Sequence, residues 1–227
     1  GDYSGSSVDM NDGGDMIIIG AIGNDGNGCC DNGHARIYKI INGQWEQQGQ
    51  DLDGDEEDDK FGRSVAMSKD GMVIAIGASG EFAGPFSGYT KVFEFNQQTK
   101  LWEQLGQTIL GESAGDYSGS SVDMNDGGDM IIIGAIGNDG NGCCDNGHAR
   151  IYKIINGQWE QQGQDLDGDE EDDKFGRSVA MSKDGMVIAI GASGEFAGPF
   201  SGYTKVFEFN QQTKLWEQLG QTILGES

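Results

Sequence analysis

Short apolar runs, separated by turns rich in glycine and asparagine, make up most of this chain. The run MIIIGAI is apolar at consecutive positions, which is typical of a strand covered on both faces. Asn42-Gly43 predicts a two-residue hairpin, because both positions of a type I′ turn need a positive φ. The predicted strands are SSVDM (6–10), MIIIGAI (16–22), HARIYKII (34–41) and QWEQQGQ (44–50). The pattern therefore predicts a module of four antiparallel strands.

The module repeats along the chain. Residues 1–113 recur without change as residues 115–227, which gives a period of 114 residues. Inside each unit GSSVDMNDGGDMIIIGAIG (5–23) aligns with GRSVAMSKDGMVIAIGASG (62–80), a weaker half-period of 57 residues. The expected modules are 1–58, 59–114, 115–172 and 173–227. Four-stranded modules at this spacing predict the blades of a β-propeller, because one blade cannot cover both faces of its own sheet. A solenoid is the alternative.

The stretch DKFGRSVAMSKDGMVIAIGAS (59–79), followed by GYTKVFEF and LWEQLGQTILGE, resembles an FG-GAP repeat of the integrin-like propellers. The matching dipeptides are Phe61-Gly62 and Gly77-Ala78, with their copies Phe175-Gly176 and Gly191-Ala192. The odd modules depart from the pattern, since they carry Ser4-Gly5 and Ser118-Gly119 instead of Phe-Gly but keep Gly20-Ala21 and Gly134-Ala135. The resemblance covers the whole chain. It implies an all-β propeller on an extracellular or cell-surface protein that serves adhesion or assembly and has no enzymatic activity.

The same resemblance sets expectations about calcium and closure. Integrin-type repeats hold Ca²⁺ in a DxDxDGxxD loop between their first two strands, but here this connection is only NDGGD or SKDG, so that site does not carry over. The chain is closest to short-turned variants of large surface proteins. Since propellers commonly close with more than four blades, we expect these four to be part of a longer array, an eight-bladed ring of two chains, or a fibre.

Charge narrows the range of partners. Thirty-eight acidic residues against 14 basic ones give a formal net charge of −24, which repels phosphate backbones and anionic lipids. Nucleic acid is excluded as a partner, and no apolar run approaches the roughly 18 residues needed for membrane insertion. No targeting signal opens the segment. The expected partners are the chain itself, other extracellular proteins and glycans.

The acidic stretch DLDGDEEDDKFG (51–62) is the first candidate site, because it places seven carboxylates within nine positions. Such closely spaced like charges repel each other unless a cation or water screens them, and oxygen ligands suit Ca²⁺. The alternative is a solvated linker between blades, since the sister linker TILGESAGDYSG makes the same connection with few acids. The candidate metal ligands are Asp51, Asp53, Asp55, Asp58 and Asp59, with their copies Asp165, Asp167, Asp169, Asp172 and Asp173. No organic cofactor is expected.

Two further loops carry candidate residues. The vicinal cysteines Cys29 and Cys30, copied as Cys143 and Cys144, lie in the exposed loop NDGNGCCDNG. Given a surface protein, oxidised cysteines are favoured: a vicinal disulfide or a bond between repeats or chains, with free thiols as the alternative. The loop GEFAGPFSG (80–88) presents aromatic rings around a proline that could contact a partner, or fold back over a blade edge. The candidate contact residues are Phe82, Phe86, Phe196 and Phe200.

The sequence contains no recognisable catalytic motif. His34 and His148 are the only histidines, each begins a strand, and both are interpreted as structural or exposed. The tryptophans recur at 57-residue spacing (45, 102, 159 and 216) and are predicted to anchor the packing between blades. The sequence therefore favours a non-enzymatic structural or adhesive protein. A Ca²⁺-dependent ligand- or glycan-binding module is the alternative, and a polysaccharide-processing propeller is the third hypothesis.

Overall fold

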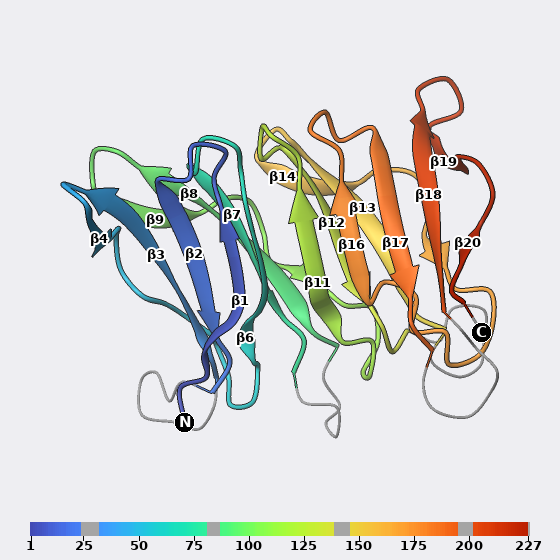
Figure 1. The fold of residues 1–227 in the computed structure, drawn as a ribbon, viewed down its shortest axis with the longest axis horizontal. Helices are drawn as coiled ribbons and strands as arrows, with labels where there is room; N and C mark the ends of the chain where they lie inside the picture. The colour runs from blue at the N-terminus through green and yellow to red at the C-terminus, as the bar shows by residue number, and fades with distance from the viewer. Residues whose placement is uncertain (24–31, 81–86, 139–145, 195–201, 227) are drawn as a thin grey trace.

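Four twisted antiparallel sheets stand side by side in a row, with the N-terminus at one end of the row and the C-terminus at the other (Figure 1). The computed structural model describes residues 1–23, 32–80, 87–138, 146–194 and 202–226. We call the sheets blades 1 to 4. This arrangement of all-β blades confirms the propeller-like fold expected from the repeat pattern. None of the described residues forms a helix that is long and apolar enough to cross a membrane.

Each blade contains five strands rather than the four predicted. Blade 1 contains β1 (Ser4–Met10), β2 (Met16–Ala21), β3 (His34–Ile41), β4 (Gln44–Gln47) and β5 (Leu52–Asp53). Blade 2 contains β6 (Phe61–Met67), β7 (Val73–Ala78), β8 (Tyr89–Asn96), β9 (Leu101–Gln104) and β10 (Ile109–Leu110). Blade 3 contains β11 (Ser118–Met124), β12 (Met130–Ala135), β13 (His148–Ile155), β14 (Gln158–Gln161) and β15 (Leu166–Asp167). Blade 4 contains β16 (Ser178–Met181), β17 (Val187–Ala192), β18 (Tyr203–Asn210), β19 (Leu215–Gln218) and β20 (Ile223–Leu224).

The extra strand arises because the outermost strand of each blade is broken in two. In blade 1, β4 and β5 both pair with β3, β4 near one end of β3 and β5 near the other. The break contains Gly49, where a Cβ atom would lie 2.7 Å from Trp102 of the next blade. The outer strand therefore leaves the ladder where it must admit the neighbouring blade's tryptophan.

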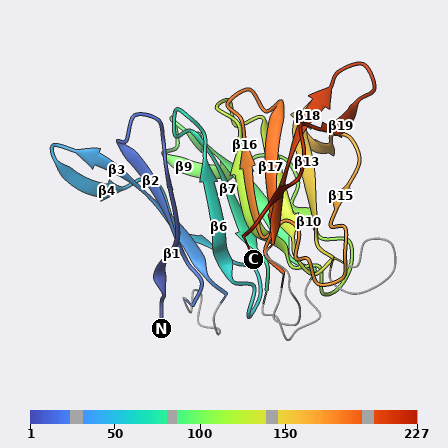
Figure 2. The ribbon, with the colours of Figure 1, turned by 45° about the vertical axis from the view of Figure 1, so that its right-hand side comes forward.

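The first strand of each blade lies against the first strand of the next, so β1, β6, β11 and β16 form the inner edge of the row. Figure 1 labels all four strands, and Figure 2 shows the row of blades from another side. The strands then run outward in sequence order to the hairpin strands β4, β9, β14 and β19. At the hairpin, Asn42 and Gly43 have φ of 52° and 80°, which confirms the predicted turn.

The hydrophobic core lies between blades, not within them. Three clusters of buried side chains fill the spaces between blades 1 and 2, blades 2 and 3, and blades 3 and 4. In blade 3, Ile132 packs toward blade 4 whereas Ile131 and Ile133 pack toward blade 2. The strand MIIIGA is thus apolar at every position because each of its faces meets a different neighbour.

Glycines allow the inner strands to approach closely. A Cβ atom on Gly20 would lie 2.1 Å from the carbonyl oxygen of Gly62 in the next blade, and Gly62 itself has φ of +86°. The hydroxyl of Ser7 donates to the same carbonyl at 2.7 Å. Ser118-Gly119 makes the corresponding contact with Gly77. The Phe-Gly and Gly-Ala dipeptides therefore mark a close approach between backbones, which serine in place of phenylalanine also permits.

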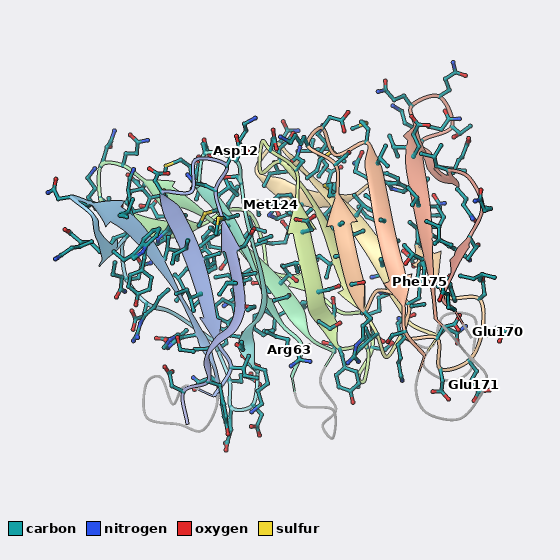
Figure 3. All side chains as sticks on the ribbon, viewed as in Figure 1. Asp12, Arg63, Met124, Glu170, Glu171 and Phe175 are labelled. Atoms are coloured by element: carbon teal, nitrogen blue, oxygen red, sulfur yellow. The ribbon has the colours of Figure 1, made fainter. Side chains whose placement is uncertain are left out.

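The linkers between blades gather at one end of the molecule, which we call the linker end. They are residues 54–60, 111–117 and 168–174. In Figure 3, Glu170 and Glu171 of the third linker lie at this end, with Phe175 following on blade 4, whereas Asp12 lies at the opposite end with the tight turns. Glu170 and Glu171 are exposed and Phe175 is buried.

Candidate functional site

A buried histidine at the linker end is the centre of the candidate site. His148 begins β13, is 3% exposed, and pairs across the sheet with Asp167 of β15. The next residue, Ala149, pairs with Leu166 of the same outer strand, so the backbone of His148 is held by two strands rather than by a loop. Such placement on rigid elements gives a side chain a defined position.

Among the described residues, one group of three potential metal ligands occurs, and it is built around this histidine. Glu112, His148 and Asp165 each offer a ligand atom, and these atoms lie within 4.8 Å of one another. Glu112 comes from the linker that leaves blade 2, whereas His148 and Asp165 belong to blade 3. The site therefore exists only where two blades meet.

A guanidinium bridges the two carboxylates of this group. Arg150, on the same strand as His148, donates from Nε to Asp165 Oδ1 at 3.0 Å and from Nη2 to Asp165 Oδ2 at 3.2 Å. Its Nη2 also forms an ion pair with Glu112 Oε2. Gln161 donates to Asp165 Oδ1 at 2.6 Å. The negative charge of the group is thus partly balanced by a side chain that is only 9% exposed.

Burial separates the protonation behaviour of the residues. It lowers the pKa of His148, so the imidazole is neutral near pH 7. Burial also raises the pKa of Asp167. For Asp165 burial acts in the same upward direction, but hydrogen bonds from Arg150 and Gln161 outweigh it and lower the pKa. Neighbouring carboxyl groups with opposite shifts are typical of sites that assign acid and base roles.

The identical sequence in blade 1 does not form the same group. There His34 Nε2 lies 3.9 Å from Asp2 Oδ1, and its buried Nδ1 has no hydrogen-bond partner. Arg36 donates to both oxygens of Asp51, at 3.0 and 2.7 Å, as Arg150 does to Asp165. Among the described residues, no further carboxylate completes a group of three ligand atoms around His34. Blade 1 therefore has two of the three ligands without the third.

The ten aspartates proposed as metal ligands lie along the linkers with protein partners of their own. Lys91 donates to Asp55 at 2.6 Å, and Lys205 donates to Asp169 at 2.5 Å. Asp58 and Asp172 form ion pairs with Lys60 and Lys174, at 3.3 and 3.8 Å. Asp59 accepts hydrogen bonds from the amides of Asp55 and Glu56 and from the Tyr89 hydroxyl, and Asp173 does the same in the second copy. Asp53 pairs across the sheet with His34, as Asp167 does with His148.

Of these ten, Asp165 is the one that the structure brings into the group of three ligands. An acidic and histidine-containing site is therefore present. The sequence reasoning missed Glu112, His148 and Arg150. One signal was available: Glu112 aligns with Asp55 in the half-repeat, and Arg150 occupies the strand position of Lys91. An acid before each linker turn and a base on the following blade thus recur at every linker.

A cavity of about 430 Å³ opens at the linker end of blade 2, and its lining includes none of the three potential ligands. Asp55, Asp59 and Tyr89 line one side, and Thr108 and Leu110 line the other. Leu110 ends β10, two residues before Glu112. Burial, together with the hydrogen bond to Asp59, raises the pKa of Tyr89, which keeps its hydroxyl protonated. The cysteines 29, 30, 143 and 144 and the phenylalanines 82, 86, 196 and 200 lie outside the described residues.

Comparison with known proteins identifies a fold but no family. No family model matches the chain, and no curated protein matches it. Solved structures do. The periplasmic gluconolactonase of Pseudomonas aeruginosa is 15% identical, with a TM-score of 0.59 over 98% of this chain and 58% of that one.

Two candidate 6-phosphogluconolactonases, from Bacteroides uniformis and Bacteroides fragilis, are 11% and 12% identical, with TM-scores of 0.52 and 0.57. Each match covers 97% of this chain and 71% of the other. The chain therefore spans between about three fifths and three quarters of the length of these propellers. At such low identity the likeness establishes the fold.

These findings correct several expectations. The resemblance to FG-GAP repeats is wrong, because no family model matches and the similar structures are propellers of the lactonase type. The dipeptides misled because their glycines mark the close approach between the backbones of neighbouring blades, which does not identify a family. The expectation of a non-enzymatic adhesive or filament-forming protein, with itself or other extracellular proteins as partners, rested on that resemblance and is wrong as well, since the similar structures carry the names of enzymes.

Proposed function

We propose that this protein hydrolyses sugar lactones at the linker end of blades 2 and 3. The observation that carries the proposal is the group formed by Glu112, His148 and Asp165 on a propeller whose similar structures are named lactonases. A lactone is a cyclic ester, so its hydrolysis needs a water that is activated as a nucleophile and a group that stabilises negative charge on the carbonyl oxygen.

A divalent cation fits the three residues. Two carboxylates and a neutral imidazole form a donor set that suits Mn²⁺ or Zn²⁺ at least as well as Ca²⁺, which prefers oxygen ligands alone. Arg150 would have to turn away from Glu112 and Asp165 for the ion to bind, because its guanidinium bridges the same oxygens. When bound, such an ion would polarise the lactone carbonyl and acidify a coordinated water.

The residues around the ion would supply the proton transfer. Asp167 lies across from His148, and burial raises its pKa, which makes its carboxylate a stronger base than that of an ordinary aspartate. It would accept the proton of the attacking water as the water oxygen bonds to the carbonyl carbon. The ring C–O bond then breaks, and the ring oxygen takes up the proton. Arg150, once displaced, could bind the carboxylate of the product.

The cavity at the linker end of blade 2, whose lining residue Leu110 precedes Glu112 by two positions, supports binding of a small polar substrate. It offers the hydroxyls of Tyr89 and Thr108 and the carboxylates of Asp55 and Asp59 as hydrogen-bonding partners for a sugar ring. One of the similar structures is named as a periplasmic enzyme. We propose that this protein also acts outside the cytoplasm.

The experiment measures acid release from glucono-1,5-lactone, with the spontaneous rate subtracted, after chelation and after addition of Mn²⁺, Zn²⁺ or Ca²⁺. Asp167→Asn should lower kcat/KM about 100- to 10,000-fold, the range for loss of a general base. Asp53→Asn is the matched control and should leave the rate unchanged, because it lies in identical sequence without Glu112 nearby. His148→Ala should abolish the response to the cation, whereas His34→Ala should preserve it. No rate above the spontaneous one with any cation would refute the proposal.

A further inference from the structure

The face of blade 4 that points away from blade 3 consists of the same residues as the face of blade 2 that blade 3 covers. Ile109 is 5% exposed because blade 3 packs on it, whereas its copy Ile223 is 56% exposed. Leu105 packs against the core between blades 2 and 3, while its copy Leu219 is 48% exposed. An apolar face that is buried in one copy and exposed in the other is missing its neighbour.

Blade 1 exposes the complementary face at the opposite end of the row. Val122 and Trp159 of blade 3 are 8% and 3% exposed where they pack on blade 2. Their copies Val8 and Trp45 are 66% and 45% exposed. A blade with the sequence of blade 1 therefore carries, side chain for side chain, the surface that covers blade 2.

The polar groups of that interface are also present on blade 4. Gln107 donates to the carbonyl of Trp159 at 2.7 Å and accepts from its amide at 2.9 Å. Gln221, the copy of Gln107, is exposed. A Cβ atom on Gly106 would lie 2.8 Å from the Trp159 ring, but on Gly220 it would meet nothing within 4 Å. The space that a tryptophan fills on blade 2 is open on blade 4.

The inner edge shows the same open space. On blade 2, Gly88 forms a parallel bridge with Ser118 of blade 3, whose amide donates to the Ser87 carbonyl at 3.0 Å. The Ser64 hydroxyl donates to the Gly119 carbonyl at 2.8 Å. On blade 4 the copies of Ser64 and Gly88, Ser178 and Gly202, line an open hollow of about 440 Å³; part of this hollow is also open on blade 2, where a cavity of about 430 Å³ has equivalent lining residues.

We propose that this face of blade 4 binds a further blade with the sequence of residues 1–58 that follows blade 4 along the chain. A covalent connection is favoured because the interface between blades 2 and 3 includes its linker: Asp116 accepts hydrogen bonds from the amides of Glu112 and Ser113, both at 2.8 Å. In a following blade, the residue that corresponds to Asp2 would accept the same hydrogen bond from the amide of Glu226. The solved propellers that this fold resembles are also longer than four such blades.

The test compares two proteins: the chain of 227 residues and the same chain with an extension after Ser227. The extension consists of one alanine, which corresponds to Ala114, followed by a copy of residues 1–58. Trp45 should be the exposed tryptophan in both proteins, because the added tryptophan would bury itself against Gln221. Acrylamide quenching of tryptophan fluorescence should therefore detect one accessible tryptophan in each. Two accessible tryptophans in the extended chain, whether the added blade is folded or not, would overturn the proposal.

Matched glutamine variants test the contact itself. Gln221→Ala should leave the thermal midpoint of the unextended chain unchanged and should lower that of the extended chain as much as Gln107→Ala does. Nearest-neighbour coupling between repeats is the reason for this expectation. Equal midpoints for the extended chain with and without Gln221→Ala would overturn it. So would concentration-dependent burial of Trp45 in the unextended chain, because the occupant would then be a second molecule.

Discussion

Blades 1 and 3 have the same sequence but different environments. Trp159 is 3% exposed and its indole nitrogen donates to the Leu105 carbonyl at 2.8 Å, while Trp45 is 45% exposed. The difference cannot come from local propensity, since the residues around both tryptophans are identical. It comes from blade 2, which lies on one side of blade 3 and leaves the matching side of blade 1 uncovered. In this protein the neighbour of a blade decides what its side chains do.

At the linker end of blades 1 and 3, identical residues also differ in their partners. His34 and His148 are both buried, and each faces an arginine–aspartate pair on its own blade. Only blade 3 receives Glu112 from the preceding linker. Each residue of the group Glu112, His148 and Asp165 has an identical copy in the sequence, but among the described residues the three come together only in this one group. Each substitution in blade 3 therefore has an internal control in blade 1.

The largest expected difference concerns the tryptophans. Trp159→Ala should lower the free energy of unfolding by about 3 to 5 kcal/mol, because it removes a fully packed ring and its hydrogen bond. Trp45→Ala should cost under about 1 kcal/mol, since nearly half of the ring is already exposed. Urea unfolding followed by circular dichroism measures both. Equal losses for the two variants would mean that packing inside its own blade, and not packing against the neighbouring blade, stabilises each tryptophan ring.

A smaller difference is expected for the arginines. Arg150→Ala leaves Glu112 and Asp165 without their shared partner and should cost about 1 to 3 kcal/mol, the range for hydrogen bonds to charged groups. Arg36 is 35% exposed and forms its ion pair with Asp51 at the surface, so Arg36→Ala should cost at most about 1 kcal/mol. The same urea titration provides the comparison. A larger loss for Arg36→Ala would contradict the role of Glu112 in the blade 2–3 contact.

The smallest expected effect is a dependence on pH. Burial lowers the pKa of His148 in the folded protein, whereas an unfolded histidine titrates near 6.5. The folded form then binds fewer protons, so stability is fully present above about pH 6.5 and is lost as pH falls toward the folded pKa. His148→Gln should flatten this loss in thermal unfolding between pH 7 and 5.

His34→Gln is the control for this pH dependence. The pKa of His34 is also lowered by burial, with a contribution from Arg36, but the carboxylate of Asp2 lies 3.9 Å from its Nε2 and acts in the opposite direction. We therefore expect His34→Gln to flatten the acid slope less than His148→Gln does. An unchanged slope in His148→Gln would show that other groups govern acid unfolding.

Much of the fold was predictable from local patterns. The alternation of apolar runs and turns located the four main strands of each blade, and Asn42-Gly43 fixed the hairpin. The spacing of the tryptophans indicated packing between blades, which Trp102, Trp159 and Trp216 show. The break in the outer strand was not predictable, because Gly49 leaves the ladder to admit a ring from 53 positions further along the chain.

The candidate site was predictable only in part. The acidic stretch was recognised as either a metal site or a linker between blades; the sequence did not indicate that Asp55 and Asp58 pair with lysines or that Asp59 caps backbone amides. The lysine and arginine partners lie on other strands, so spacing in the linker gives no sign of them. The family resemblance failed for a related reason: a Gly-Ala dipeptide shows that backbones approach closely, and it says nothing about which family the blade belongs to.

The sequence by itself determined the strands, their turns and the apolar character of both blade faces, because these depend on contacts between residues near each other in the chain. Only the tertiary structure decided which acidic residues pair with a lysine or arginine, which histidine lies near Glu112, and which tryptophan is buried. The physical reason is that each blade buries its faces against its neighbours, so identical residues differ in solvent exposure and partners according to their position in the row. The acidic linker DLDGDEEDD is therefore explained less by its own composition than by Arg36, Lys60, Lys91 and Tyr89 around it.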